Sequence, residues 1–231
     1  VRKSTTINMF DILNIDSRSE EAQKINEDLY KNNKKLLTIY DPPYNEWNEA
    51  PTFKSHSVIA FCSHQSRHEA EKKLGKPRTE LVWFFKDGRW VSNYLPRITH
   101  NYIYVYGETD LASVGEKQST KPQKKGKGSI GQDKSLGDRI YYPKPYKQLN
   151  SVLCYSRNMK SGYWSKPEKM INQLIRWVQP DAVLDPFASY GSIGSVCLDL
   201  KINYIGFEID KNIVGIAQSR FKAHRTKSYV L

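Results

Sequence analysis

The sequence predicts an α/β fold built on a doubly wound, mostly parallel sheet. Short apolar runs with the composition of strands alternate with helical repeats in the first 75 residues and again after residue 165. Such alternation is typical of β-α-β units, whose strands lie parallel in one sheet. Between residues 80 and 106 two strand-forming runs follow each other without a helix, which predicts an antiparallel hairpin at one edge of the sheet.

The first part of the chain supplies two predicted strands and two predicted helices. Both strands are β-branched and aromatic runs of the kind that is buried in parallel sheets. After Tyr44 only 12 residues, 45–56, lead to the second strand, near the lower limit for a parallel crossover. We expect Asp16-Ser17 to cap the first helix and Gly75 to end the second, because glycine adopts left-handed backbone readily. The strands are predicted at residues 36–40 and 57–63, and the helices at residues 20–33 and 65–74.

The middle and last parts supply the other elements. A strongly β-forming run begins at Glu80, and Lys86-Asp87-Gly88-Arg89 predicts the turn after it, because Asp-Gly is a strong hairpin signal. Further on, Pro167 lies near the first turn of a predicted helix, where proline is favoured. Strands are predicted at residues 80–85, 102–106, 182–185 and 204–208, and helices at residues 166–178, just before residue 200 and at residues 211–224.

Composition and charge narrow the class of protein. Hydrophobic residues make up 39% of the chain and charged residues 26%, ordinary values for a globular protein. No apolar run reaches the length of a membrane span and the first residues lack an apolar signal core, so we expect no membrane segment and no secretion. The three cysteines are widely spaced, which argues against a metal site or a disulfide framework and fits the cytoplasm.

The net charge of +12 favours a polyanionic partner, nucleic acid first. Residues 107–160 carry 11 Lys and Arg against 5 Asp and Glu, a net charge of +6 that is half of the total. Within this segment a basic, polar stretch without periodicity predicts a loop, and tyrosines interleave with cations as base stacking and phosphate contact require. The candidate nucleic-acid-binding residues are Lys117, Lys121, Lys124, Lys125, Lys127, Arg139, Tyr141, Tyr142, Lys144 and Lys147.

The tetrapeptide Asp41-Pro42-Pro43-Tyr44 directly follows a predicted buried strand. It therefore lies at the carboxyl edge of the sheet, where open α/β sheets bind their ligands. Neither proline has an N–H, both fix φ near −65°, and the second keeps the first out of the helical region. The resulting stiff turn offers carbonyl oxygens, a carboxylate and an aromatic ring but few donors. It is equipped to hold an amino group.

A second motif joins the predicted strand at residues 182–185 to the next helix. The turn from Asp185 to Gly194 is rich in small residues, so a ligand can approach its backbone closely. About twenty residues later the next predicted strand ends at Glu208, where a carboxylate can accept hydrogen bonds from two ribose hydroxyls. The pair predicts a site for a nucleoside-containing cofactor, although a glycine-rich joint that serves packing alone would look similar.

Together these motifs resemble the amino-methylating DNA methyltransferases. The tetrapeptide comes first, Lys166-Pro167-Glu168 opens a late helix, and the turn at Asp185 and the run Gly206-Phe207-Glu208-Ile209-Asp210 follow. Because the tetrapeptide precedes the cofactor turn, the order is similar to that of the circularly permuted β group. The resemblance implies a Rossmann-like methyltransferase domain whose catalytic part is residues 1–106 and whose cofactor-binding part is residues 158–231. Residues 107–157 would form a small basic insert that recognises the target.

The resemblance also implies a role for each matching residue. Asp41 and the carbonyl of Pro42, held by Pro43, would accept hydrogen bonds from the amino group of an adenine flipped out of double-stranded DNA, and Tyr44 would stack on that base. S-Adenosylmethionine would donate the methyl group directly to the adenine N6. Residues that match cofactor-binding positions are Asp185, Pro186, Phe187, Ser189, Gly191, Glu208, Lys166 and Ser165, with a looser match at Asp11.

The chain departs from the family pattern where Ser189-Tyr190-Gly191 replaces the usual Gly-x-Gly, which restricts the approach of a cofactor to the backbone. Asp before Pro-Pro-Tyr favours adenine over the N4 of cytosine. An RNA substrate and a catalytically silent, nucleic-acid-binding subunit remain alternatives, and protein glutamine methylation fits less well because those enzymes place the cofactor turn first. The small insert suggests a homodimer or partner subunit. The family further implies sequence-specific DNA methylation in a restriction-modification setting, in a bacterial or phage-infected cell.

Overall fold

The computed structural model describes residues 10–43, 45–89, 94, 97–107, 111, 123–124, 140–141, 148–157 and 165–228. One sheet of eight strands organises them, in the order β1-β10-β9-β2-β3-β5-β4-β8, and β6 pairs with β7 separately. The strands are β1 (Phe10–Asn14), β2 (Leu36–Tyr40), β3 (Ser57–Cys62), β4 (Thr79–Arg89), β5 (Ile98–Gly107), β6 (Gln123–Lys124), β7 (Ile140–Tyr141), β8 (Val152–Cys154), β9 (Ala182–Asp185) and β10 (Asn203–Glu208).

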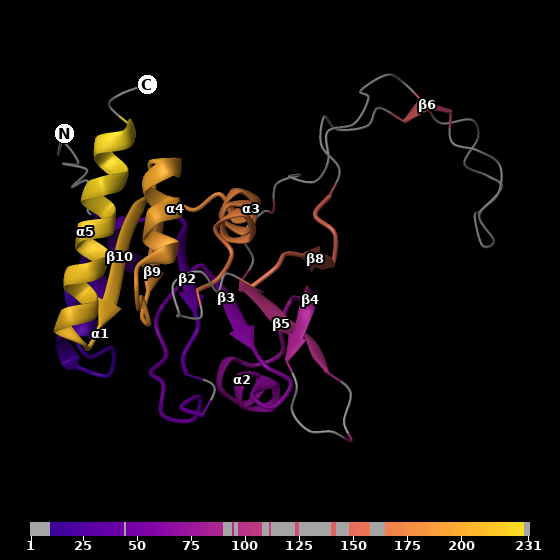
Figure 1. Ribbon diagram of the computed structural model, residues 1–231, viewed down its shortest axis with the longest axis horizontal. Coiled ribbons are helices and arrows are strands. Elements are labelled where there is room, and N and C mark those ends of the chain that lie inside the picture. The colour runs from indigo at the N-terminus through magenta and orange to yellow at the C-terminus, as the bar shows by residue number, and fades with distance from the viewer. Residues whose placement is uncertain are drawn as a thin grey trace.

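The predicted doubly wound sheet is confirmed. Strands β1, β10, β9, β2 and β3 pair in parallel, β5 is antiparallel to both of its neighbours, and β8 adds to β4 in parallel. Helices cover both faces (Figure 1), with α3, α4 and α5 packed on one face and α1 and α2 on the other. The helices are α1 (Glu20–Asn32), α2 (Arg67–Leu74), α3 (Glu168–Val178), α4 (Ser192–Leu200) and α5 (Lys211–Ser228).

Strand β2 is buried along its whole length because both faces of the sheet are covered. Leu37 and Ile39 face the layer of α3 and α4, whereas Leu36 and Tyr40 face the opposite layer. This is the physical reason for its mostly apolar sequence, since a parallel strand with two covered faces has no side that faces solvent; its polar Thr38 is buried as well. Its carboxyl end delivers Asp41 to the middle of the sheet edge.

The crossover from β2 to β3 forms no helix in its described residues 45–56. It is held instead by side chains: the Asn26 amide donates to the Lys54 carbonyl at 2.9 Å and accepts from the Lys54 N–H at 2.8 Å. Trp47 is fully buried, and the Tyr40 hydroxyl donates to the Pro51 carbonyl at 2.7 Å. These contacts let a connection of only 16 residues, 41–56, span two neighbouring parallel strands without a helix in its described part.

Two local predictions were wrong, and one strand was not predicted. The first helix is capped by Ser19, whose hydroxyl accepts from the Ala22 N–H at 3.2 Å, and Asp16-Ser17 lies outside it. Strand β4 continues through the Asp-Gly pair to Arg89, with an irregularity in its pairing after Phe84, so the turn predicted at residues 86–89 does not form there. A strand at residues 152–154 extends the sheet beyond the predicted edge, because three residues are too few to give a recognisable pattern.

Candidate active site

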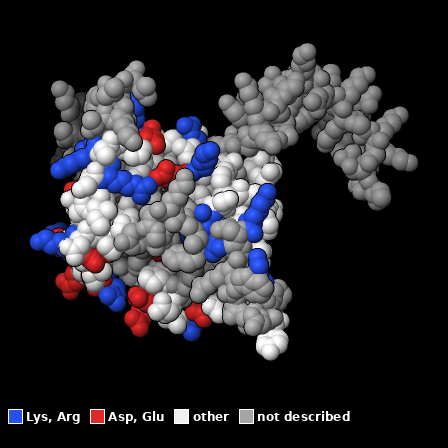
Figure 2. Space-filling model, viewed as in Figure 1, with Lys and Arg blue, Asp and Glu red and all other residues white. Residues whose placement is uncertain are grey.

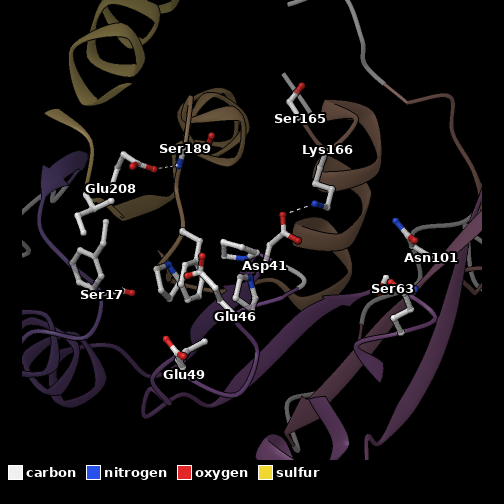
Figure 3. Close-up of a pocket in the computed structure, with 18 of the residues that line it drawn as sticks. Ser17, Asp41, Glu46, Glu49, Ser63, Asn101, Ser165, Lys166, Ser189 and Glu208 are labelled. Atoms are coloured by element: carbon white, nitrogen blue, oxygen red, sulfur yellow. Dashed lines mark hydrogen bonds and ion pairs between the residues drawn. The ribbon is translucent and has the colours of Figure 1, made fainter. Parts of the chain in front are cut away.

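A cavity of about 1070 Å³ opens at the carboxyl edge of the parallel strands. Residues that follow β1, β2, β3, β9 and β10 line it, together with the start of β5, part of β4 and the segment before α3. Figure 3 shows Ser17, Ser189 and Glu208 at one end, Ser63 and Asn101 at the other, and Asp41 between them. The volume lies at the upper end of the range for small-molecule sites, roughly 300–1,000 Å³. The cavity is therefore roomy enough for two ligands side by side.

Asp41, Pro42 and Pro43 line the centre of this cavity, as the tetrapeptide predicts. Pro42 is buried and Pro43 is exposed, and the Pro43 carbonyl accepts the Glu46 N–H at 2.8 Å, which closes the turn. The Asp41 side chain is 22% exposed, so solvent screens its charge only partly. Tyr44 lies outside the described residues.

Lys166 forms an ion pair with Asp41 through its Nζ and Oδ2 of the carboxylate. The two residues are 125 positions apart in the chain, and only the fold brings them together. The ammonium also lies 5.0 Å from the centre of the Phe61 ring, within cation–π range. Ser165 and Lys166, both matched to cofactor-binding positions by the resemblance, line the cavity.

Glu208 and Ser189 join the two elements that form the other end of the cavity. The Ser189 N–H donates to Oε2 of Glu208 at 3.0 Å, and the Asp210 N–H donates to Oε1 at 2.9 Å. Each carboxylate oxygen keeps further acceptor capacity for a ligand. Ser189 has φ of 46°, in the left-handed region that favours glycine, so this position does require the conformation that a glycine would adopt more easily.

Asp185 does not line the cavity, whereas the neighbouring Pro186 and Phe187 do. Its carboxyl group is fully buried and accepts a hydrogen bond from the Tyr204 hydroxyl at 3.1 Å. Burial raises the pKa of this carboxyl group to about 7, against the lowering effect of the Tyr204 hydrogen bond. Asp185 therefore lies behind the turn and not on the cavity wall, and its hydrogen bond to Tyr204 supports the turn.

Gly191 also lies behind the turn. Its φ is 69°, and a Cβ atom at this position would come within 2.7 Å of the Phe221 ring. The glycine is needed for close packing between the turn and α5. It is not among the residues that line the cavity.

The first strand contributes through residues other than the predicted Asp11. Asp11 is exposed on β1, accepts a hydrogen bond from the neighbouring Ile12 N–H and is not among the lining residues. Asp16 and Ser17 line the cavity instead, and the Arg18 hydrogen bond lowers the pKa of Asp16. Sequence reasoning treated these two residues as a helix cap. Their place directly after an apolar run was the available signal, because parallel strands bring such residues to the ligand edge.

Sequence reasoning also missed the wall formed by the antiparallel strands. Trp83 of β4 lies opposite Asn101 of β5 in the strand register, and both line the cavity. Phe85 packs against Trp83, and the Arg157 guanidinium lies 4.8 Å from the Phe85 ring centre. No local pattern marks these residues, because they meet only through the pairing of β4 with β5.

The predicted nucleic-acid-binding residues lie outside the described part of the chain, apart from the backbone of Lys124 in β6 and Tyr141 in β7. Among the described residues, Arg97 and Arg157 place positive charge on the wall of the cavity near β4 and β5. The face drawn in Figure 2 carries several Lys and Arg side chains on the side of β4, β5 and β8, while Asp and Glu gather mainly along the lower rim.

Comparison with known proteins identifies the class. The model of a DNA methylase family, N6_N4_Mtase, matches residues 64–219, about two thirds of the chain. The chain belongs to this family of DNA methylases. The matched range includes Lys166, the turn after β9 and Glu208, and it begins after Asp41.

Solved structures agree with this fold. The M1.HpyAVI–SAM complex has a TM-score of 0.57 at 18% identity, covering 92% of this chain and 100% of that one. The PvuII DNA methyltransferase, cytosine-N4-specific, also has a TM-score of 0.57, at 13% identity, covering 91% and 85%. TTHA0409 from Thermus thermophilus, complexed with S-adenosyl-L-methionine, has a TM-score of 0.51 at 12% identity, covering 94% of each chain. A search of the curated proteins gave no match.

No helix in the described ranges combines the length and the apolar character that crossing a membrane requires.

Proposed function

We propose that this chain transfers a methyl group from S-adenosylmethionine to the N6 of an adenine in a specific sequence of double-stranded DNA. One observation carries the proposal: Asp41 and Pro42, equipped to hold an amino group, share a single cavity with Glu208, equipped to hold a ribose. Methyl transfer from a cofactor to an amino group needs both sites next to each other. Membership of the DNA methylase family supplies the substrate class.

The hydrogen-bonding groups, apolar surface and charges of the cavity fit S-adenosylmethionine. Glu208 offers acceptors to the two ribose hydroxyls, and Ile209, which is 62% exposed, offers an apolar surface to the adenine ring. At the other end of the cofactor, Ser165 suits the methionine carboxylate. Five carboxylates line the cavity and favour a positively charged sulfonium; they are Asp16, Asp41, Glu46, Glu49 and Glu208.

The chemistry assigned to the chain is that of positioning. Bound S-adenosylmethionine would supply an electrophilic methyl group on sulfur. Asp41 and the Pro42 carbonyl would accept the two hydrogens of the target amino group, which turns the nitrogen lone pair out of conjugation with the ring. Acceleration then comes from orientation and fixed dipoles rather than from a covalent bond to the protein.

The target base would enter by the wall of β4 and β5. A base inside a duplex cannot present its amino group to an enclosed site, so it must be flipped out. Trp83 and Phe85 provide aromatic surface on this wall, and Ser63 and Asn101 provide hydrogen-bonding groups. We assign stacking on the base to Tyr44, on the strength of its place after Pro43.

These roles divide the chain into three parts with different functions. Residues 1–106 would hold the catalytic carboxylate, residues 158–231 the cofactor, and residues 107–157 the DNA, with its ten basic and tyrosine candidates as contacts. Arg97 and Arg157 extend positive charge from that segment's side towards the cavity. A homodimer or a partner subunit would enlarge the small recognition surface, and a bacterial or phage-infected cytoplasm with a partner nuclease is the setting we propose.

A methylation assay tests the proposal. The purified chain is incubated with S-adenosylmethionine labelled in its methyl group and with genomic DNA, and the modified nucleoside is identified by mass spectrometry. We expect N6-methyladenine with the wild type and with Asp28→Asn, a matched change at an exposed position of α1. We expect at least a ~100-fold loss with Asp41→Ala, as for other removed transition-state contacts.

Other products would redirect the proposal. If N4-methylcytosine forms, the chemistry is as proposed but the target base is cytosine. If the label is found in RNA and not in DNA, the substrate is RNA. Cofactor binding by calorimetry without any transfer to DNA or RNA would favour the silent subunit. Sequencing of methylated sites in the same DNA would give the recognition sequence.

A further inference from the structure

We propose that Lys166 is a positioning residue for Asp41: it holds one carboxylate oxygen so that the other faces the target amino group. This inference rests on the function proposed above and goes beyond it, because the sequence assigns Lys166 to the cofactor. The observation behind it is the ion pair between Lys166 Nζ and Asp41 Oδ2 in the centre of the cavity.

Both partners are fixed by stiff surroundings. Lys166 directly precedes Pro167, whose φ of −59° fixes the backbone at the start of α3. Its ammonium lies over the ring of Phe61, a fully buried residue of β3. Asp41 lies between the buried strand β2 and two prolines. An ion pair between two such anchored groups loses little conformational freedom when it forms, unlike a pair of mobile surface side chains.

Burial strengthens the effect of the Lys166 ion pair on Asp41. The side chains of Lys166 and Asp41 are only 10% and 22% exposed, so water compensates little for the loss of either charge. A carboxylate has an acceptor at each of its two oxygens, so Asp41 can accept from the Lys166 ammonium and from a target amino group at the same time.

The geometry divides the carboxylate between two partners. Lys166 occupies Oδ2, which leaves Oδ1 and the Pro42 carbonyl as acceptors for the two amino hydrogens. Without Lys166 the side chain would be free to rotate about its terminal torsion, a broad and weakly restricted one. Loss of this restraint should cost catalysis rather than cofactor binding, because small errors in orientation cost large factors in rate.

Kinetics separate this role from that of a cofactor ligand. We expect Lys166→Met to lower kcat by ~10- to 100-fold at saturating cofactor while the Kd for S-adenosylmethionine, measured by calorimetry, changes less than threefold. Lys166→Arg, which keeps the charge, should restore most of kcat. A Kd raised more than tenfold with kcat unchanged at saturation would overturn the proposal and make Lys166 a cofactor ligand.

A double-mutant cycle without cofactor tests the pair itself. Lys166→Met alone leaves a partly buried, unpaired carboxylate, so we expect its Tm to fall further than that of the double variant Asp41→Asn/Lys166→Met. Strictly additive shifts in Tm would overturn the pairing. If the wild type is inactive on every DNA while the cycle is non-additive, the proposed function fails and the pairing stands. Wild-type activity lost in Asp41→Ala but kept in Lys166→Met overturns this inference alone.

Discussion

The backbone N–H of Ser189 donates a hydrogen bond to the Glu208 carboxylate at 3.0 Å, which ties the turn after β9 to the end of β10. Because Asp210 donates to the other carboxylate oxygen, Glu208 is held in one orientation before any ligand arrives. A carboxylate oriented in advance binds its ligand without losing freedom of its own.

This orientation predicts a measurable effect on cofactor affinity. Glu208→Ala removes the acceptors that we assign to the two ribose hydroxyls and should weaken S-adenosylmethionine binding at least ~100-fold, since hydrogen bonds to charged groups are worth about 1.5–3 kcal/mol each. Glu208→Gln keeps one acceptor and should lie between. Calorimetric titration measures each Kd, with Asp28→Asn as the control. An unchanged Kd in Glu208→Ala would place the ribose elsewhere.

A change on the wall of β4 and β5 should affect the reaction with DNA and leave cofactor binding unchanged. Asn101→Ala should lower kcat/KM for DNA ~10-fold, the worth of about one hydrogen bond, while the Kd for the cofactor stays as in the wild type. Asn32→Ala, an exposed change on α1, serves as the control. Steady-state kinetics with varied DNA and saturating cofactor separate the two effects. Equal losses for DNA and cofactor would mean that Asn101 supports the whole cavity instead of the base.

Asp185 predicts a dependence of stability on pH. Its folded-state pKa of about 7 lies above the ordinary value of 3.8, so the folded protein binds this proton more tightly than the unfolded chain. The contribution of Asp185 to stability is fully present below about pH 4 and is lost as the pH rises towards 7.

Urea unfolding at several pH values checks this dependence. The free energy of unfolding of Asp185→Asn, relative to the wild type, should rise between pH 4 and pH 8 by up to roughly 4 kcal/mol, because the amide does not titrate. For Asn32→Ala, an exposed change that alters no titratable group, the difference from the wild type should stay nearly constant over the same range. A constant difference in Asp185→Asn as well would contradict a raised pKa.

Two glycines of the last third predict opposite responses to the same change. Gly191→Ala places a Cβ at positive φ against the Phe221 ring, and should lower the free energy of unfolding by about 1–3 kcal/mol. Gly215→Ala in α5 meets nothing within 4 Å and should raise it by about 0.5–1 kcal/mol, because alanine favours a helix. Urea unfolding of both variants measures the contrast, and equal signs would refute it.

The helix-free crossover predicts a strong effect of one buried amide. Asn26→Ala breaks both hydrogen bonds to the Lys54 backbone and should cost about 2–4 kcal/mol of unfolding free energy. Gln23→Ala removes only a 3.4 Å contact to the Thr52 carbonyl and should stay within about 0.5 kcal/mol. Limited proteolysis should cut residues 45–56 faster in Asn26→Ala alone. Equal protection of both variants would show that Trp47 and Tyr40 hold the crossover by themselves.

Much of this architecture could be predicted from the sequence because its strands are buried on both sides. Strands β2 and β9 are short, mostly apolar runs that are buried along their whole length, and each leads into a motif at the ligand edge. Local sequence could not predict the partners of these motifs. The Lys166–Asp41 pair joins residues 125 positions apart, and Asn101 reaches the cavity only through the register of β4 with β5.

Other differences have local causes. Ser189 adopts a left-handed conformation although it is not glycine, because the hydrogen bond from its N–H to Glu208 compensates part of the strain. Asp-Ser is a common helix start, so the sequence favours a helix cap at Asp16. In the structure Asp16 lines the cavity, because β1 pairs with β10 and ends at the same edge of the sheet. The ten predicted DNA-contacting residues stay predictions.

The sheet order places β10 and β9 between β1 and β2. A ribosome that synthesises this chain therefore exposes β1 and β2 long before the strands that separate them exist. At about 5–20 residues per second, the wait from the end of β2 to the end of β10 lasts roughly 8–34 s. During that time the nascent chain has the carboxylate of Asp41 but lacks Glu208, so the cavity can be completed only after β10 has been synthesised.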